Sequence, residues 1–422
     1  MTKGNKNKFF AYYWSSIFQL AFGSLISQII TMVVAPISTR LYSPEQLGIY
    51  TLIITIVSMF GPVLSGKYDM SIVSVQDENE VMELVVGSTM ISVIFTILVS
   101  IGCEYFLITK EEIIKEIGIY RFLLIPLLLV NGFINIVNSY NNRYKEYKIM
   151  SNAYITRTTA QNVGLILFGL LDLGSVGLIL SQFFGSLFGL KKQSKRLYNN
   201  RILLRRVKLK GVKKTLIKYK KQPLFSMPAH FINSASYSIL NFFISGLFGI
   251  NIFGYYSMSY RILGLPLNLV SMNVSKVFFQ RASEEKAVKG NYNKTLKQMT
   301  LFLAFISITI TLIIIVFGPF IFELVFGKGW YVSGVYARIL APMYGLRFIV
   351  SALTPALIVS GEQKLEVIIQ SLFIAGSLFC YLLTRMFGFN INEFLTFISI
   401  TFSIIYILFY FIIYKLSKKN VL

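Results

Sequence analysis

Five arginines fall inside long apolar stretches of this sequence, where a charged side chain is costly. They are Arg121, Arg157, Arg261, Arg338 and Arg347. A charge at membrane depth usually faces a water-filled cavity or a partner group and marks a functional position. Every Asp and Glu can be placed in a loop or at the end of an apolar stretch, so the interior carries unbalanced positive charge. Because guanidinium groups bind phosphate through paired hydrogen bonds, this pattern predicts an anion-binding cavity.

The arginines differ in depth. Arg157, Arg261 and Arg347 lie well inside their stretches, which favours the cavity interpretation. Arg121 and Arg338 lie near the ends of theirs, where an arginine can instead reach the interface or pair with a helix-end carbonyl. The residues predicted to bind an anionic head group are Arg157, Arg261, Arg347, Arg40 and Arg338.

Polar side chains recur at helical spacing along several of these stretches. Amides and phenols of this kind suit the hydroxyl groups of a sugar, and they are predicted to line the cavity. The alternative is hydrogen bonding between helices, which is common in membrane bundles. The predicted lining residues are Asn131, Asn135, Asn138, Gln161, His230, Asn233, Tyr237, Asn241 and Asn268.

The sequence gives little support for a metal site, a disulfide framework, a cofactor or an enzyme activity. His230 is the single histidine, and Cys103 and Cys380 are the only cysteines, so we expect no metal site, no disulfide framework and no cofactor. Nucleotide-binding motifs are absent, and we expect a protein that is not an enzyme. His230 could relay protons, although a packing role is the more common one for a lone histidine.

The elements that must position these residues are membrane-spanning helices. Of 422 residues, 55% are hydrophobic and 14% charged, which suits a fold dissolved in lipid. A span needs about 20 apolar residues. Twelve such runs are predicted, over residues 14–38, 46–66, 82–107, 117–140, 149–171, 174–190, 223–247, 252–278, 296–318, 334–359, 365–387 and 393–415.

Charge gives the predicted orientation. The net charge of +23 is concentrated in short loops, which argues for orientation by basic residues and contact with anionic lipid heads, and against nucleic acid as a partner. The most basic loops and both tails fall on one side of a twelve-span chain, so both termini are predicted to be cytoplasmic. Residues 191–221 hold 14 Lys and Arg and no acid, and they are interpreted as a topological anchor and solvated linker rather than as a partner site.

A weak internal repeat supports two halves. The segment Leu41–Tyr50 resembles Leu247–Tyr256, at an offset close to half the chain (254 − 48 = 206). The prediction is an all-α integral membrane protein with two parallel six-helix lobes around a central cleft. Its parts are an N-terminal lobe (1–190), a basic cytoplasmic linker (191–221) and a C-terminal lobe (222–422).

The residues that follow the first span resemble a known family. The run from Ile37 to Tyr50, ISTRLYSPEQLGIY, and the later Gly66–Asp69, GKYD, resemble the Wzx-type oligosaccharide-lipid flippases of the multidrug/oligosaccharidyl-lipid/polysaccharide exporter superfamily. Many members of that family have Arg where this chain has Lys67. The resemblance implies two lobes with alternating access, and a carrier for undecaprenyl-pyrophosphate-linked oligosaccharides in the bacterial cytoplasmic membrane, serving O-antigen, lipopolysaccharide or capsule synthesis.

The functional hypothesis is therefore a flippase whose deep arginines hold the pyrophosphate. Its expected partners are the lipid-linked oligosaccharide and membrane lipids, with a polysaccharide polymerase and chain-length machinery as further candidates. One alternative is a multidrug or cation antiporter of the same fold, which commonly needs intramembrane acids. Another is a membrane-embedded polymerase or ligase, which tends to need a large outer loop.

Overall fold

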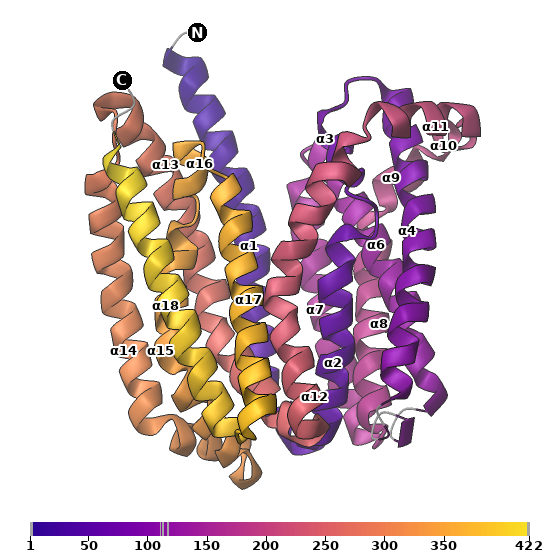
Figure 1. Ribbon diagram of the computed structural model, residues 1–422. Helices are drawn as coiled ribbons and strands as arrows, with labels where there is room; N and C mark the ends of the chain where they lie inside the picture. Colours follow the sequence, from indigo (N-terminus) through magenta and orange to yellow (C-terminus); the bar gives the residue numbers. More distant parts are fainter. Residues whose placement is uncertain (1–2, 110, 112–113, 116–117, 420–422) are drawn as a thin grey trace. The chain divides into compact units, whose positions relative to one another are not determined.

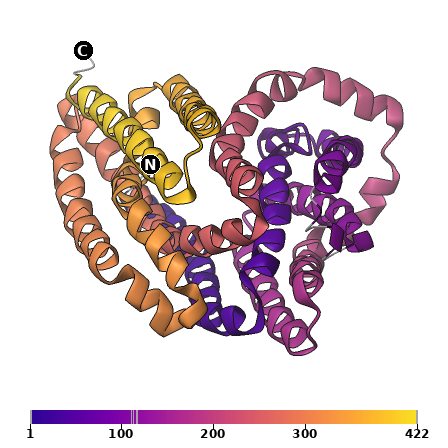
Figure 2. The same cartoon turned by 60° about the horizontal axis from the view of Figure 1, so that its bottom comes forward.

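The computed structural model describes residues 3–109, 111, 114–115 and 118–419, and the side chains among them except those of 3–21, 106 and 268. These residues form helices and short connections, with no strand in the part described (Figure 1). The chain divides into two compact units, Met1–Ser234 (unit 1) and Ala235–Leu422 (unit 2). The helices of each unit run alongside one another (Figure 2).

Unit 1 holds the helices that carry the first half of the sequence. Two of them, α7 and α8, form a tight hairpin, which corresponds to the predicted runs 149–171 and 174–190. The elements of unit 1 are α1 (Lys3–Leu41), α2 (Pro44–Phe60), η1 (Gly61–Val63), α3 (Asp69–Ser74), α4 (Glu78–Ile108), η2 (Gly118–Leu123), α6 (Leu124–Arg143), α7 (Tyr147–Leu170), α8 (Gly174–Gln193), α9 (Lys195–Asn199), α10 (Arg201–Arg205), α11 (Leu209–Lys218), η3 (Gln222–Ser226) and the start of α12.

Unit 2 begins within a long broken helix and ends at the C-terminal span. Its elements are the remainder of α12 (Met227–Pro266), η4 (Leu267–Ser271), α13 (Met272–Lys289), α14 (Asn293–Phe326), η5 (Lys328–Trp330), α15 (Tyr331–Leu353), α16 (Ala356–Ser360), α17 (Lys364–Phe387) and α18 (Ile391–Lys418).

The number of spans agrees with the sequence prediction. Eight segments of the described chain are long and apolar enough to cross a membrane. The longest of them, Gln222–Lys289, contains α12, which a break at Gly249 divides into two arms. The more polar helices α7, α8 and α15 pack along helices of that set and have spanning length. Counting the two arms separately and adding these three gives twelve helices, six for each half of the chain. The predicted all-helical membrane fold is confirmed.

The internal repeat corresponds to equivalent breaks in the two halves. Ser43 separates α1 from α2 and caps α2, since its side chain accepts a hydrogen bond from the Gln46 backbone N–H. Gly249, which is 206 positions later, interrupts α12 with φ 82° and ψ 171°. That φ lies in the left-handed region that favours glycine. One half thus turns at a capping box and the other at a glycine, which explains why the repeat is weak residue by residue.

Small residues allow the helices of unit 1 to approach closely. A Cβ added at Gly132 of α6 would lie 2.1 Å from the Ser92 Oγ of α4, and one added at Gly185 of α8 would lie 2.9 Å from the Arg157 carbonyl oxygen of α7. Close approach through small residues is the usual packing device in lipid, where apolar burial gives no preference for protein over acyl chains. These glycines therefore fix which faces of α6 and α8 meet their neighbours.

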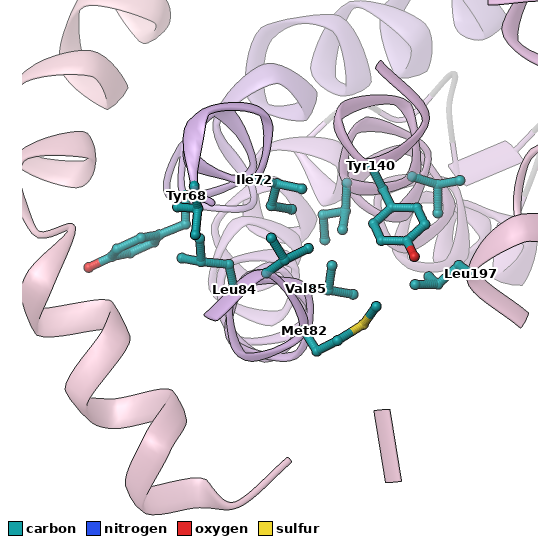
Figure 3. Packing of buried hydrophobic residues seen from close by; sticks show 11 residues of the cluster. Tyr68, Ile72, Met82, Leu84, Val85, Tyr140 and Leu197 are labelled. Atoms are coloured by element: carbon teal, nitrogen blue, oxygen red, sulfur yellow. The ribbon is translucent and has the colours of Figure 1, made fainter. Parts of the chain in front are cut away.

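An apolar cluster joins α3, α4, α6 and α9 at one end of unit 1 (Figure 3). Tyr68, Ile72 and Val85 are buried there, together with Tyr140 and Leu197. The predicted linker 191–221 thus contains the end of α8 and three short helices, and one of its residues joins this cluster. The boundary between the two compact units follows Ser234, which lies within α12, so it does not fall in residues 191–221.

Candidate functional site

Arg347 lies on α15 among the aromatic side chains of unit 2. Its guanidinium carbon lies 4.8 Å from the centroid of the Tyr237 ring and 5.5 Å from that of Tyr344. Tyr344 is one helical turn before Arg347, and Tyr237 comes from the first arm of α12. Both distances fall within the range of a cation–π interaction. The positive charge of Arg347 is therefore stabilised by ring faces.

A small cavity of about 20 Å³ adjoins this arginine. A cavity of that size holds roughly one water molecule. Five tyrosines from three helices line it with Arg347, and we call these six residues the Arg347 cage. Its members are Arg347, Tyr237, Tyr256, Tyr260, Tyr344 and Tyr406.

No acid in the described part of the chain neutralises the cage. Among the residues that the structure describes, no carboxylate lies within ion-pair distance of Arg347. The polar groups beside it are neutral: Ser236 donates a hydrogen bond to the side chain of Gln370, whose Nε2 donates to the Tyr237 hydroxyl at 3.4 Å. The cage therefore offers one permanent cation and several hydroxyl groups, a donor set suited to an anion with polar substituents.

The other two deep arginines are half-buried, as Arg347 is. Arg157 of α7 lies in unit 1, with its guanidinium carbon 4.9 Å from the centroid of the Tyr154 ring. Gly189 of α8 faces its Cβ, so the base of this side chain is held by the α7–α8 hairpin. Arg261 lies in the second arm of α12. Arg347 is the one of the three that the structure places in a tyrosine-lined cavity.

The arginines near helix ends take a different environment. Arg40 in the last turn of α1 is exposed. Arg338 is exposed and its Nη2 donates to the Val316 carbonyl at 3.4 Å. Arg121 pairs with Glu104 and donates to the Gly118 carbonyl at 2.7 Å. These are the interface and carbonyl contacts expected of arginines at the ends of spans.

A larger cavity beside Arg121 is mostly apolar. It has a volume of about 400 Å³ and lies between α4, η2 and α6, with Ile97, Ile101 and Phe122 among its lining residues. Since Glu104 already neutralises Arg121, this cavity lacks the free positive charge of an anion site.

The predicted polar residues of α6 and α7 are used between helices of unit 1. Asn135 donates to the Gly61 carbonyl at 3.0 Å, and Asn138 accepts from Gln193 at 2.8 Å. Gln161 donates to the Tyr50 hydroxyl at 3.0 Å. Asn131 lies against Gly61, whose added Cβ would be 2.4 Å from the Asn131 Oδ1. These contacts match the interhelical alternative, and all four side chains remain half-buried.

The predicted residues of α12 divide between the two units. His230 is exposed and Asn233 is half-buried in unit 1, whereas Tyr237 and the buried Asn241 belong to unit 2. Of these, Tyr237 belongs to the Arg347 cage. The side chain of Asn268 lies outside the described residues.

The turn Gly66–Asp69 in unit 1 contributes to the sequence resemblance described above, and its backbone geometry is unusual. Gly66 and Lys67 have φ of 60° and 61°, and Lys67 is only 9% exposed. The Asp69 carboxylate accepts hydrogen bonds from Ser65 and, at 3.3 Å, from Ser139. A lysine in a left-handed conformation is strained, and such strain is typical of functional positions. The φ value of Lys67 could not be predicted from the composition of the sequence.

The start of α12 packs against the end of α2, the helix that precedes this turn. Ser234 donates to the Met59 carbonyl at 2.8 Å, and the Phe231 ring centroid lies 5.6 Å from that of Phe60. His230, one turn before Ser234, interacts electrostatically with Lys67 and Asp69. The described part of the chain has no cluster of His, Cys, Asp and Glu that could hold a metal ion.

Several solved structures that share this fold are described as membrane transporters or as a lipid flippase. An inward-facing multidrug resistance MATE family transporter of the MOP superfamily matches with TM-score 0.68 and 16% identity, over 96% of each chain. The lipid II flippase MurJ, in an inward closed conformation, matches with TM-score 0.71 and 15% identity, over 94% of this chain and 87% of the other. A MOP superfamily transporter from Pyrococcus furiosus matches with TM-score 0.65 and 16% identity, over 96% of each chain. The chain is thus a multi-pass membrane protein that shares the fold of these solved structures.

The family follows from the sequence itself. The family described as polysaccharide biosynthesis protein matches residues 37–334, well over half of the chain, and the chain belongs to that family. No curated protein matches it.

Proposed function

We propose that this protein is a flippase for lipid-linked oligosaccharides whose head group is a pyrophosphate. It would move repeat units on undecaprenyl pyrophosphate from the inner to the outer leaflet of the bacterial cytoplasmic membrane by alternating access, for surface polysaccharide synthesis. Both termini would lie in the cytoplasm. The observation that carries the proposal is the Arg347 cage, a half-buried cation with no acidic partner among the described residues, in a chain of the polysaccharide biosynthesis family.

The chemistry of the substrate explains the composition of the cage. A pyrophosphate cannot enter hydrocarbon without compensation, because burying an unpaired charge is strongly unfavourable. Arg347 offers a planar pair of donors to phosphate, and the cage tyrosines offer hydroxyl groups to the attached sugar. The cavity of about 20 Å³ is too small for such a head group, so the tyrosine side chains must move apart when the substrate binds.

Transport by reconstituted vesicles tests the proposal. We expect Arg347→Gln to lower the rate of lipid-linked oligosaccharide translocation roughly 10- to 100-fold, since a hydrogen bond to a charged group contributes about 1.5–3 kcal/mol. Arg347→Lys should retain part of the rate, because it keeps the charge and loses the paired geometry. The matched control is Arg385→Gln, which removes an exposed arginine from the end of α17. Wild-type translocation by Arg347→Gln would refute the proposed site.

The same vesicles separate flippase from antiporter. A cation antiporter would depend on a membrane-embedded acid, and Asp69 is a buried acid at the start of α3, which follows the span Pro44–Val63 in unit 1. Accumulation of a cationic dye that is abolished by Asp69→Asn, together with normal transport by Arg347→Gln, would favour the antiporter.

A further inference from the structure

The basic segment between α8 and α12 is a folded part of unit 1, and its last helix, α11, is attached to the start of α4. Thr215 donates a hydrogen bond to Glu83, and Tyr219 donates one to Glu80 at 3.0 Å. Lys218 also forms an ion pair with Glu80, and this hydrogen-bonded contact raises the pKa of the Lys218 ammonium. Three polar contacts thus hold α11 against the first turns of α4.

The apolar contacts place α11 beside a membrane-spanning stretch. A Cβ added at Gly87 of α4 would lie 2.9 Å from Leu216 and 3.1 Å from Val212. Gly87 lies inside the apolar span of α4, whereas Glu80 lies near its beginning. The polar contacts of α11 are therefore with the first turns of α4, and its apolar contacts are with the more apolar part of the same helix that follows.

The exposed surface of α11 also combines large apolar side chains with lysines. Leu209 and Ile217 are 71% and 56% exposed and lie two turns apart beside the flank that contacts Gly87, with the exposed Lys213 between them on the helix surface. Lys210 and Lys214, four residues apart, form the next row and are exposed. Without a lipid phase, two large aliphatic side chains would face water next to lysines. With α11 at the interface, they enter the acyl region while the lysine heads reach the polar layer.

The segment that contains α11 carries charge of one sign, and the acids that α11 contacts, Glu80 and Glu83 of α4, already have hydrogen-bond partners on it. The neighbouring α10 adds the exposed cations Arg201 and Arg205, and residues 191–221 contain no acid. We propose that α11 is an interfacial helix that binds anionic phospholipid head groups, with Lys210, Lys213 and Lys214 as the head-group ligands and Leu209 and Ile217 in the acyl boundary. This inference does not depend on the transported substrate.

Quenching of a reporter tryptophan by brominated lipids tests the site. Ile217→Trp is introduced into the full chain, which is reconstituted into phosphatidylcholine vesicles with a small fraction of either brominated phosphatidylglycerol or brominated phosphatidylcholine. The signal of the chain without the reporter is subtracted. We expect stronger quenching by the anionic lipid, with local enrichment of at least about fivefold, because each lysine near an anionic surface contributes about 1 kcal/mol.

Two charge variants of the reporter chain measure the contribution of the three lysines to the lipid enrichment. Substituting Lys210, Lys213 and Lys214 by Gln should bring quenching by the two lipids to the same level, while substituting all three by Arg should preserve the enrichment. The matched control replaces the exposed cations Arg281, Lys294 and Lys297 of unit 2 by Gln and should leave it unchanged. Thermal melting of each variant verifies that the fold is intact.

Two results would overturn the proposal. Equal quenching by both lipids in the starting reporter chain would show that α11 contacts the bilayer without selecting charge. An absence of quenching by either lipid would place Ile217 outside the bilayer, as expected if this face receives an acidic protein instead.

Discussion

The guanidinium carbon of Arg347 lies 4.8 Å from the centroid of the Tyr237 ring, although the two residues are 110 positions apart. The ring face stabilises the cation in a site where the described residues offer no carboxylate. A carboxylate would form a strong internal ion pair and would compete directly with an incoming anion. A ring is a weaker partner and can be exchanged for phosphate. This contact therefore suits a site that binds and releases an anionic head group.

The contribution of the Tyr237 ring can be measured as stability. We expect Tyr237→Leu to lower the free energy of unfolding by about 0.5–2 kcal/mol, the range of a cation–π interaction. Tyr237→Phe keeps the ring face and loses the hydroxyl that accepts from Gln370, so it should have a smaller effect. Thermal melting of the purified variants tests this, and an equal loss in both would assign the effect to the hydroxyl.

Lys67 provides a test of functional strain. Lys67→Gly should relieve a left-handed backbone, which costs a residue with a side chain about 1 kcal/mol or more, yet it should impair transport. Lys145 is the matched control, since it has nearly the same φ, 59°, and is exposed. Lys145→Gly should leave transport unchanged and should not lower the melting temperature. Normal transport by Lys67→Gly would show that the lysine side chain held in this strained conformation has no functional role.

The break in α12 depends on Gly249. Gly249→Ala should destabilise the protein by about 1–2 kcal/mol, because its φ of 82° is unfavourable for any residue with a Cβ. Gly246, one turn earlier, has open space around it, and Gly246→Ala should be neutral or stabilising by up to about 1 kcal/mol. Melting temperatures of the two variants give the comparison. Equal effects would mean that the break does not require glycine.

The packing of α4 on α6 predicts a coupled pair. Gly132→Ala should destabilise by about 1–3 kcal/mol, because its new methyl would lie 2.1 Å from the Ser92 Oγ. Ser92→Ala removes that oxygen, which forms no hydrogen bond with any described residue. The double variant should therefore recover much of the loss. A double-mutant cycle measures this coupling, and strictly additive effects would contradict the contact.

Much of the fold could be predicted from the sequence because lipid imposes a simple requirement on every span. Apolar length gave the twelve helices, and the repeat around Ser43 located the equivalent break at Gly249. The nature of residues 191–221 could not be foreseen in the same way. Composition alone does not reveal that Thr215 and Lys218 bind Glu83 and Glu80 and so hold the segment as helices on α4.

The candidate site was predicted in part. Arg347 and Tyr237 were identified as an intramembrane charge and a polar residue of a helical stripe. The aromatic residues that surround them, such as Tyr260 and Tyr406, resemble ordinary packing residues in the sequence and become distinctive only when α15 and α18 bring them together. The environment of Asn138 depends on its contact with Gln193 of a different helix, which helical periodicity does not encode.

Equilibrium binding of a prenyl pyrophosphate is the most direct test of the Arg347 cage. The purified protein would be placed in nanodiscs and titrated with a short-chain prenyl pyrophosphate, and the dissociation constants of the wild type, Arg347→Gln and Arg385→Gln would be compared. The cage predicts equal binding by the wild type and Arg385→Gln, and at least about tenfold weaker binding by Arg347→Gln. Equal affinity in all three proteins would contradict the assignment of Arg347 as the anion-binding residue.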